Sequence, residues 1–128
     1  TTLISSEQTQ ADNARYQNAL SLGAGWTRWP SYWNIVETSP NQWNWADYDR
    51  LVIDDVRHNL NVNAILLGRP EFFAEGNIIV GLNEPIFADG TDTPALGKTI
   101  NPYNPWANFV YQAVQRYKPN QLSSFLLH

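Results

Sequence analysis

The amino-acid sequence predicts a mixed α/β fold built from parallel βα units. Helical and extended patterns alternate along the chain, in the order helix, strand, helix, strand, long loop and helix. The clearest strand, residues 61–67, ends in a continuous apolar run, as strands buried in parallel sheets do. Hydrophobic residues make up 43% of the 128 residues, which is enough for the core of one small domain.

The chain is expected to begin with a loose arm, because residues 1–11 are largely polar. The remaining residues, 12–128, are then expected to form the domain. Its first helix is predicted over residues 12–22. Asp12 can cap the amino end of this helix, and Gly23 can stop it.

A short strand, an aromatic loop and a second helix come next. The strand is predicted over residues 25–29 and is expected to end at Pro30. Residues 30–45 form the aromatic loop. A helix is predicted over residues 46–58, because apolar side chains recur there at i, i+3, i+4 and i+8 on one face. Asn59 suits the left-handed position that ends a helix.

A long irregular segment separates the strand at residues 61–67 from the last helix. Residues 71–104 form a 34-residue excursion with repeated Gly and Pro breaks, in which residues 78–80 could make a short strand. An excursion of this length is usually functional or partly disordered. Asn104 is a good N-cap for the last helix, and Pro105 suits its first position. Its apolar stripe consists of Trp106, Phe109, Val110, Ala113, Val114 and Tyr117.

The composition argues against several classes of partner. The net charge is -4 and no basic run exists, so neither a nucleic acid nor an anionic membrane is expected as a partner. No apolar stretch approaches the roughly 20 residues that a membrane span needs. The chain has no Cys, hence no disulfide or thiolate metal site. It also has no Met, so we expect that it was processed or cut from a longer protein.

Aromatic residues are unusually abundant, and most of the six Trp lie between residues 26 and 45. One interpretation is that these rings form the core. The other is that they form a surface on which sugars stack, because flat apolar ring faces suit the C–H-rich faces of pyranoses.

An ordered set of short motifs runs through residues 14–119. The motifs are Leu22-Gly23, Trp26-Thr27-Arg28-Trp29, Trp33-Asn34-Ile35-Val36-Glu37, Gln42-Trp43-Asn44-Trp45, Tyr48-Asp49, Leu66-Leu67-Gly68-Arg69-Pro70 and Arg116-Tyr117. In this order they resemble the early part of the clan A glycoside hydrolases. The resemblance implies a partial (β/α)8 (TIM) barrel, roughly the second and third βα units with a long loop after the third strand. A complete barrel needs roughly 250 residues.

The resemblance also implies a set of substrate-binding residues. Arg28 would lie at the carboxyl end of the second barrel strand and hold the nucleophile carboxylate through charge-assisted hydrogen bonds. The alternative role for Arg28 is a surface ion pair. The aromatic walls of the sugar subsites would be Trp29, Trp33 and Trp43.

Asn83-Glu84-Pro85 matches the acid/base motif of the same family. There, Asn83 would bond the sugar 2-hydroxyl and Glu84 would act as general acid and then base. The spacing argues against this role, since only 12 residues separate Pro70 from Asn83. A βα crossover alone takes at least about 10–12 residues. Both interpretations of Glu84, the acid/base and a residue of the loop after the third strand, stay open.

No metal or cofactor is expected. Asp89 and Asp92 faintly resemble a Ca²⁺ loop, but the complete ligand spacing is missing and Asx turns explain them better. Asp54 and Asp55 are expected on the solvent side of their helix or at its edge. The two histidines lack partners at metal-ligand spacing, and no phosphate loop or nucleotide fingerprint is present.

Three functions follow as hypotheses. The first is a fragment of a retaining β-glycoside hydrolase, inactive alone, whose partners are carbohydrate and the remainder of the barrel. The second is a non-catalytic structural or carbohydrate-binding subunit of a larger assembly. The third is a small active hydrolase that uses Glu84 with Glu71, Glu75 or Asp89. Whether the chain is an enzyme is therefore left open. Secretion is expected from the resemblance and the missing Met.

Overall fold

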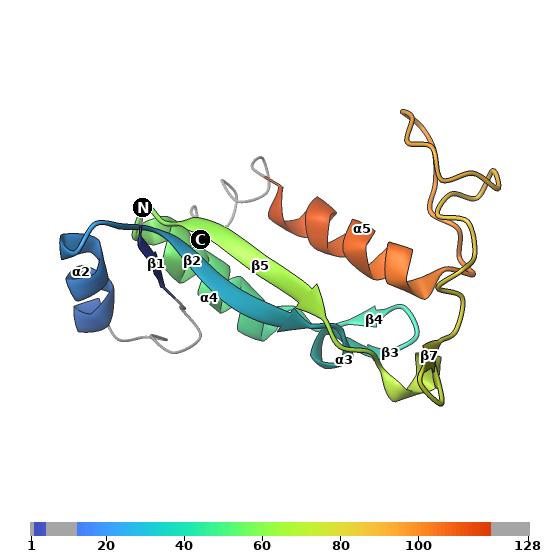
Figure 1. Ribbon diagram of the computed structural model, residues 1–128, viewed down its shortest axis with the longest axis horizontal. Coiled ribbons are helices and arrows are strands. Elements are labelled where there is room, and N and C mark those ends of the chain that lie inside the picture. Colours follow the sequence, from blue (N-terminus) through green and yellow to red (C-terminus); the bar gives the residue numbers. More distant parts are fainter. Residues whose placement is uncertain (1, 5–12, 119–128) are drawn as a thin grey trace.

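The computed structural model describes residues 2–4 and 13–118 (Figure 1). Its main element is a parallel sheet of three strands in the order β1-β2-β5. The strands are β1 (Thr2–Ile4), β2 (Ala24–Tyr32) and β5 (Asn61–Leu67). Parallel strands that follow one another both in the chain and in the sheet confirm the predicted mixed α/β class. The described residues close no barrel, so the partial TIM barrel stays a prediction.

Three of the helices lie where the sequence predicts them. They are α2 (Asn13–Ser21), α4 (Ala46–Arg57) and α5 (Pro105–Tyr117). The last begins as expected, because the side chain of Asn104 accepts a hydrogen bond from the backbone N–H of Ala107 at 3.1 Å. A left-handed backbone follows α4, where φ is 59° at Asn59.

β2 is longer than predicted, because it continues through Pro30 to Tyr32. Proline cannot donate a ladder hydrogen bond and is tolerated mainly where a strand has a free edge. The pairing with β1 ends where Ile4 lies opposite Thr27. Among the described residues, the second half of β2 therefore has a neighbour on the β5 side alone, which leaves room for Pro30 within the strand.

The segment expected as a loose arm contributes the third strand of the sheet. Thr2, Leu3 and Ile4 pair in parallel with the start of β2 as β1. Residues 5–11 lie outside the described part of the chain. The ordered motifs of the resemblance contain no counterpart for a strand that precedes β2.

The expectation that the strand at residues 61–67 is buried on both faces is wrong. No side chain of β5 is fully buried, and Ala64 in its middle is exposed. β5 is the outermost strand of the sheet within the described residues. The buried side chains of β2 point to one face, while Trp26 and Arg28 on the other face are exposed. Within the part of the chain that the structure describes, one face and one edge of β5 are therefore open.

Both irregular segments contain short elements. The aromatic loop forms the one-turn helix α3 (Trp33–Val36) and an antiparallel hairpin of β3 (Glu37–Ser39) with β4 (Gln42–Trp43). The long excursion begins with a 3-10 turn at Glu71–Phe73 and a hairpin of β6 (Ala74–Glu75) with β7 (Ile78–Ile79). The predicted short strand therefore forms, but it pairs within its own hairpin and does not join the main sheet.

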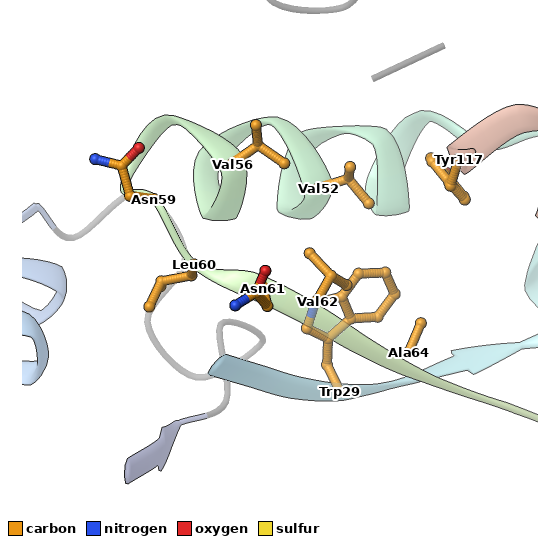
Figure 2. Close-up of a pocket in the computed structure, with 9 residues that line it drawn as sticks. All are labelled: Trp29, Val52, Val56, Asn59, Leu60, Asn61, Val62, Ala64 and Tyr117. Carbon is orange, nitrogen blue, oxygen red and sulfur yellow. The ribbon is translucent and has the colours of Figure 1, made fainter. Parts of the chain in front are cut away.

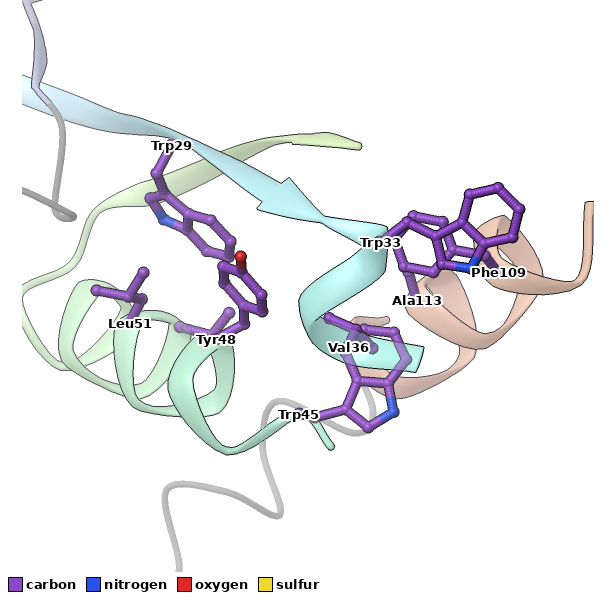
Figure 3. Packing of buried hydrophobic residues seen from close by; sticks show 9 residues of the cluster. Trp29, Trp33, Val36, Trp45, Tyr48, Leu51, Phe109 and Ala113 are labelled. Atoms are coloured by element: carbon purple, nitrogen blue, oxygen red, sulfur yellow. The ribbon is translucent and has the colours of Figure 1, made fainter. Parts of the chain in front are cut away.

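Stacked aromatic rings form the core between β2, α3, α4 and α5 (Figure 3). The ring of Trp29 stacks on Tyr48 with 5.5 Å between centroids, and Trp33 stacks on Phe109 at 5.6 Å. The buried members of this cluster are Trp29, Trp33, Val36, Trp45, Tyr48, Leu51, Val52, Phe109 and Ala113. The aromatic abundance of the sequence is therefore used in large part for packing.

The expectation that Asp55 faces solvent is wrong. Its carboxylate is fully buried and accepts hydrogen bonds from Tyr16 Oη at 2.9 Å, Thr27 Oγ1 at 2.6 Å and Trp29 Nε1 at 2.9 Å. Burial of a charge is tolerated when hydrogen bonds replace its water. Asp55 thereby joins α4 to both α2 and β2.

Candidate functional site

The carboxyl ends of β2 and β5 lie at the same edge of the sheet, which is where ligand sites form in parallel α/β folds. The turn after β5 packs against the turn after β2 at this edge. A Cβ atom on Gly68 would lie 2.6 Å from Oδ1 of Asn34, and φ at Gly68 is +84°. Only glycine fits this approach without strain. Residues 71–104 continue from this edge toward α5 (Figure 1).

Arg28 lies on the open face of the sheet, away from the core. It is the central residue of β2 (Ala24–Tyr32), so the prediction that it lies at the carboxyl end of the strand is wrong. It is exposed, and its register partner on β5 is Asn63, which is exposed too. Within the described residues Arg28 makes no ion pair, so the alternative role as one half of a surface ion pair finds no partner there. Trp26 is 44% exposed on the same face. This face therefore carries a free guanidinium, an amide and an aromatic ring.

The three predicted aromatic walls differ in their exposure. Trp29 and Trp33 are 1% and 0% exposed, and their ring nitrogens donate hydrogen bonds to buried carboxylates. A sugar cannot stack on a ring whose faces are already covered, so in this structure both are core residues. Trp43 is partly exposed and stacks on Trp45 with 5.8 Å between centroids. Of the three, Trp43 alone offers surface to a ligand.

Asn83 and Glu84 have exposed side chains on a backbone that is held in place. The side-chain amide of Asn104 donates to the carbonyl of Glu84 at 2.8 Å, and that of Asn101 donates to the carbonyl of Pro85 at 2.9 Å. Both of these asparagines are buried. Asn104 therefore caps α5 and fixes the motif with the same side chain, which places Glu84 beside the start of that helix.

The two ends of the loop that carries Asn83 and Glu84 also lie close together. A Cβ atom on Gly81 would lie 2.1 Å from the carbonyl oxygen of Tyr103, and φ at Gly81 is +83°. The motif therefore lies after β7 and before α5, in the loop that follows β5, as the spacing indicates. It does not end a strand of the main sheet.

No second carboxylate is paired with Glu84 by a described contact. Glu71 and Glu75 are exposed in the 3-10 turn and in β6. Asp89 forms an ion pair with Lys98 at 3.0 Å. Hydrogen bonds from Thr91 and Lys98 hold the pKa of Asp89 below its ordinary value, whereas a general acid needs a raised one.

Asp89 and Asp92 close turns within their loop, as predicted. Asp89 Oδ1 accepts from the backbone N–H of Thr91 at 3.0 Å, and Asp92 Oδ1 accepts from that of Ile86 at 2.9 Å. In residues 2–4 and 13–118, no three His, Cys, Asp or Glu side chains come together as metal ligands.

Two hollows lie elsewhere, along β5 on the face that carries the helices. The larger has a volume of about 530 Å³ and lies between α4 and β5 (Figure 2). It is lined by Trp29, Val52, Val56, Asn59, Leu60, Asn61, Val62, Ala64 and Tyr117. Its lining is largely apolar and contains no carboxylate, so it lacks the groups that hydrolysis requires.

Sequence reasoning missed the role of Asn101 and the second role of Asn104. Both lie in the segment Asn101-Pro102-Tyr103-Asn104-Pro105. Two asparagines that alternate with prolines could have signalled side-chain amides that bond to a nearby loop. Asn104 was recognised for its helix cap alone, because its contact with Glu84 joins residues 20 positions apart.

Comparison of the chain with protein-family models, curated proteins and solved structures gives no match. The resemblance to the clan A glycoside hydrolases therefore rests on the ordered motifs. Among the described residues, no helix has the length and apolarity needed to cross a membrane.

Proposed function

We propose that the chain supplies consecutive βα units of a glycoside hydrolase-like (β/α) barrel that acts on β-glycosidic bonds. The observation that carries the proposal is the open face of the parallel sheet, where Arg28 and Asn63 lie in register. In a barrel, the face away from the helices lines the interior that leads to the active site. A guanidinium on that face is suited to hold a carboxylate or a sugar hydroxyl.

Three side chains in the segments that follow β2 and β5 also suit a carbohydrate. Asn83 and Glu84 project from a fixed backbone, and Trp43 offers a partly exposed ring. Sugars are bound by planar polar side chains together with aromatic faces. We propose that Glu84 belongs to the loop that borders the substrate. Its role as the acid/base is the alternative.

The chain alone is proposed to be inactive. Retention requires two carboxyl groups about 5–5.5 Å apart, and Glu84 has no such partner in a described contact. The second catalytic carboxylate would come from the remainder of the barrel. The motif order likewise implies that this chain and the remainder of the barrel each supply part of the active site.

Oligosaccharide binding tests the proposal. We expect the chain to bind at least one of the β-linked gluco-, xylo- and galacto-oligosaccharides when they are titrated into it in a calorimeter. Arg28→Ala should lower its affinity about tenfold, which corresponds to about 1.4 kcal/mol. Arg50→Ala is the matched control, because Arg50 is exposed on α4, away from the open face. The absence of binding to every sugar, or equal losses in both variants, would contradict the proposal.

A second candidate is a non-catalytic subunit of a larger assembly. The observation that favours it is the edge of β5 that no described strand covers, because an uncovered edge can pair with a strand of a partner. Assays of β-glycoside hydrolysis separate the possibilities. Activity in the isolated chain that Glu84→Gln abolishes, with unchanged folding, would favour the small active hydrolase. Activity in neither the chain nor a larger protein that contains it would favour the subunit.

A further inference from the structure

Tyr103 is the most exposed aromatic side chain among residues 13–118, at 76%. The rings that the sequence predicts as sugar walls offer less surface, because Trp29 and Trp33 are buried and Trp43 stacks on Trp45. No ring of the described residues packs on Tyr103. Its ring is therefore available to a ligand.

The backbone that carries this ring is held from both sides. The N–H of Tyr103 donates to Oδ1 of the buried Asn101 at 3.0 Å. The carbonyl of Tyr103 lies against Gly81, where an added Cβ would come within 2.1 Å of the carbonyl oxygen. Pro102 restricts the backbone further, because its ring fixes φ. A tyrosine has few side-chain torsions, so on such a backbone it loses little conformational entropy when it binds a ligand.

The polar side chains of the proposed sugar site belong to the segment that contacts this backbone. Asn104 follows Tyr103 directly, and its side-chain amide donates to the carbonyl of Glu84 at 2.8 Å. Gly81, which lies against the Tyr103 carbonyl, precedes Asn83 by two positions. The side chains of Asn83 and Glu84 are both exposed. These contacts bring an amide, a carboxylate and an aromatic ring to neighbouring backbone positions.

The charge of residues 71–104 limits the kind of sugar that suits this position. The segment contains five carboxylates and one ammonium group, so its net charge is -4, the same as that of the whole chain. Lys98 forms an ion pair with Asp89 at 3.0 Å, while Glu71, Glu75 and Glu84 are exposed and make no described ion pair. A negative surface repels anionic ligands. The charge therefore favours a neutral sugar over a uronic acid.

We propose that Tyr103 is the aromatic platform of the substrate site, on which one pyranose of a neutral β-linked glycan stacks. The apolar C–H face of the pyranose covers the ring, and Asn83 and Glu84 bond to hydroxyl groups at its rim. Tyr103 thereby takes the role that the resemblance gives to Trp29 and Trp33. The inference rests on the proposed function and adds to it the stacking residue and the neutral class of the sugar.

Substitutions of Tyr103 in the full chain test the stacking. The same neutral gluco-, xylo- and galacto-oligosaccharides are titrated by calorimetry. Tyr103→Ala should lower the affinity of the best ligand about tenfold, whereas Tyr103→Phe should keep it within about twofold because the ring remains. Tyr111→Ala is the matched control, since Tyr111 is 42% exposed in the middle of α5. The Tm of all three variants should equal that of the unsubstituted chain.

The outcomes separate this inference from the proposed function. Unchanged affinity in Tyr103→Ala, together with weaker binding in Arg28→Ala, would overturn the inference and leave the proposed function standing. An equal loss in Tyr103→Phe and Tyr103→Ala would assign the contact to the hydroxyl group and would overturn the stacking. If the unsubstituted chain binds no neutral oligosaccharide, the proposed function and this inference both fall.

An anionic glycan tests the neutral class of the sugar. The probe is a cello-oligosaccharide oxidised at C6 to glucuronic acid, compared with the best neutral ligand of the same length. The oxidised chain should bind at least about tenfold more weakly, and the difference should shrink as ionic strength rises, because salt screens the repulsion. Binding of the oxidised chain that equals or exceeds that of the neutral ligand would overturn the assignment to neutral sugars.

Discussion

Replacement of Asp55 should destabilise the chain far more than replacement of its neighbour Asp54. Three donors, the side chains of Tyr16, Thr27 and Trp29, bond to the Asp55 carboxylate, and all three residues are buried. Asp55→Ala leaves those donors without an acceptor. A buried unsatisfied donor costs about 1–3 kcal/mol, and partial relaxation limits the sum to about 3–5 kcal/mol.

The assay is urea unfolding monitored by tryptophan fluorescence, because Trp29 lies within the network. Asp55→Asn should cost about 2 kcal/mol, since its carbonyl oxygen still accepts while its amide faces donors. Asp54 is only half-buried, so Asp54→Ala should stay within about 0.5 kcal/mol. The total stability of small domains is about 5–15 kcal/mol, so the Asn variant remains measurable even if the Ala variant is largely unfolded.

The reasoning would be refuted by equal stability of the Asp54 and Asp55 variants. A loss confined to α2 in hydrogen exchange would also count against it, because Asp55 bonds to β2 as well as to α2. A graded loss, with Ala above Asn and Asn above the control, is the result that the geometry requires.

Three further outcomes are expected. Gly81→Ala should lower the Tm more than Gly90→Ala does. Both glycines have a positive φ, but of the two only Gly81 has a backbone atom 2.1 Å from an added Cβ. Equal changes in Tm would contradict the close approach of the two ends of the loop. Thr91→Ala should raise the pKa of Asp89 toward its ordinary value in an NMR titration. The folded pKa of Asp89 is lowered, so its contribution to stability is present above the unfolded pKa of about 3.9 and is lost as pH falls through the folded pKa. Thr91→Ala should make this pH-dependent loss smaller. A pKa of Asp89 that does not change in Thr91→Ala would contradict the prediction. Asp49→Ala should lower the free energy of unfolding in urea by about 1–2 kcal/mol, because it removes the hydrogen bonds that join α4 to Arg116 and Tyr117 of α5. A change below about 0.5 kcal/mol would show that these contacts do not stabilise the packing of α4 on α5.

The candidate site could be predicted only in part. The position of Asn83 and Glu84 in the loop after β5 followed from counting residues, because a crossover has a minimum length. The burial of Trp29 and Trp33 did not follow, because a tryptophan in an aromatic-rich sequence suits a core and a sugar surface equally. The two hydrogen bonds that fix the motif join residues 16 and 20 positions apart, and no local pattern records them.

The sequence by itself determined the three longer helices and the order in which they alternate with β2 and β5. Helical periodicity, the Asn104 cap and the left-handed Asn59 are local features, and local interactions decide where helices start and stop. Tertiary structure alone decided the rest. Asp55 points inward because three donors lie around it. Among the described residues, β2 continues past Pro30 where β1 no longer pairs with it, and no strand covers the outer edge of β5. Burial of a polar group, tolerance of proline and exposure of an edge all depend on neighbours that are distant in the chain.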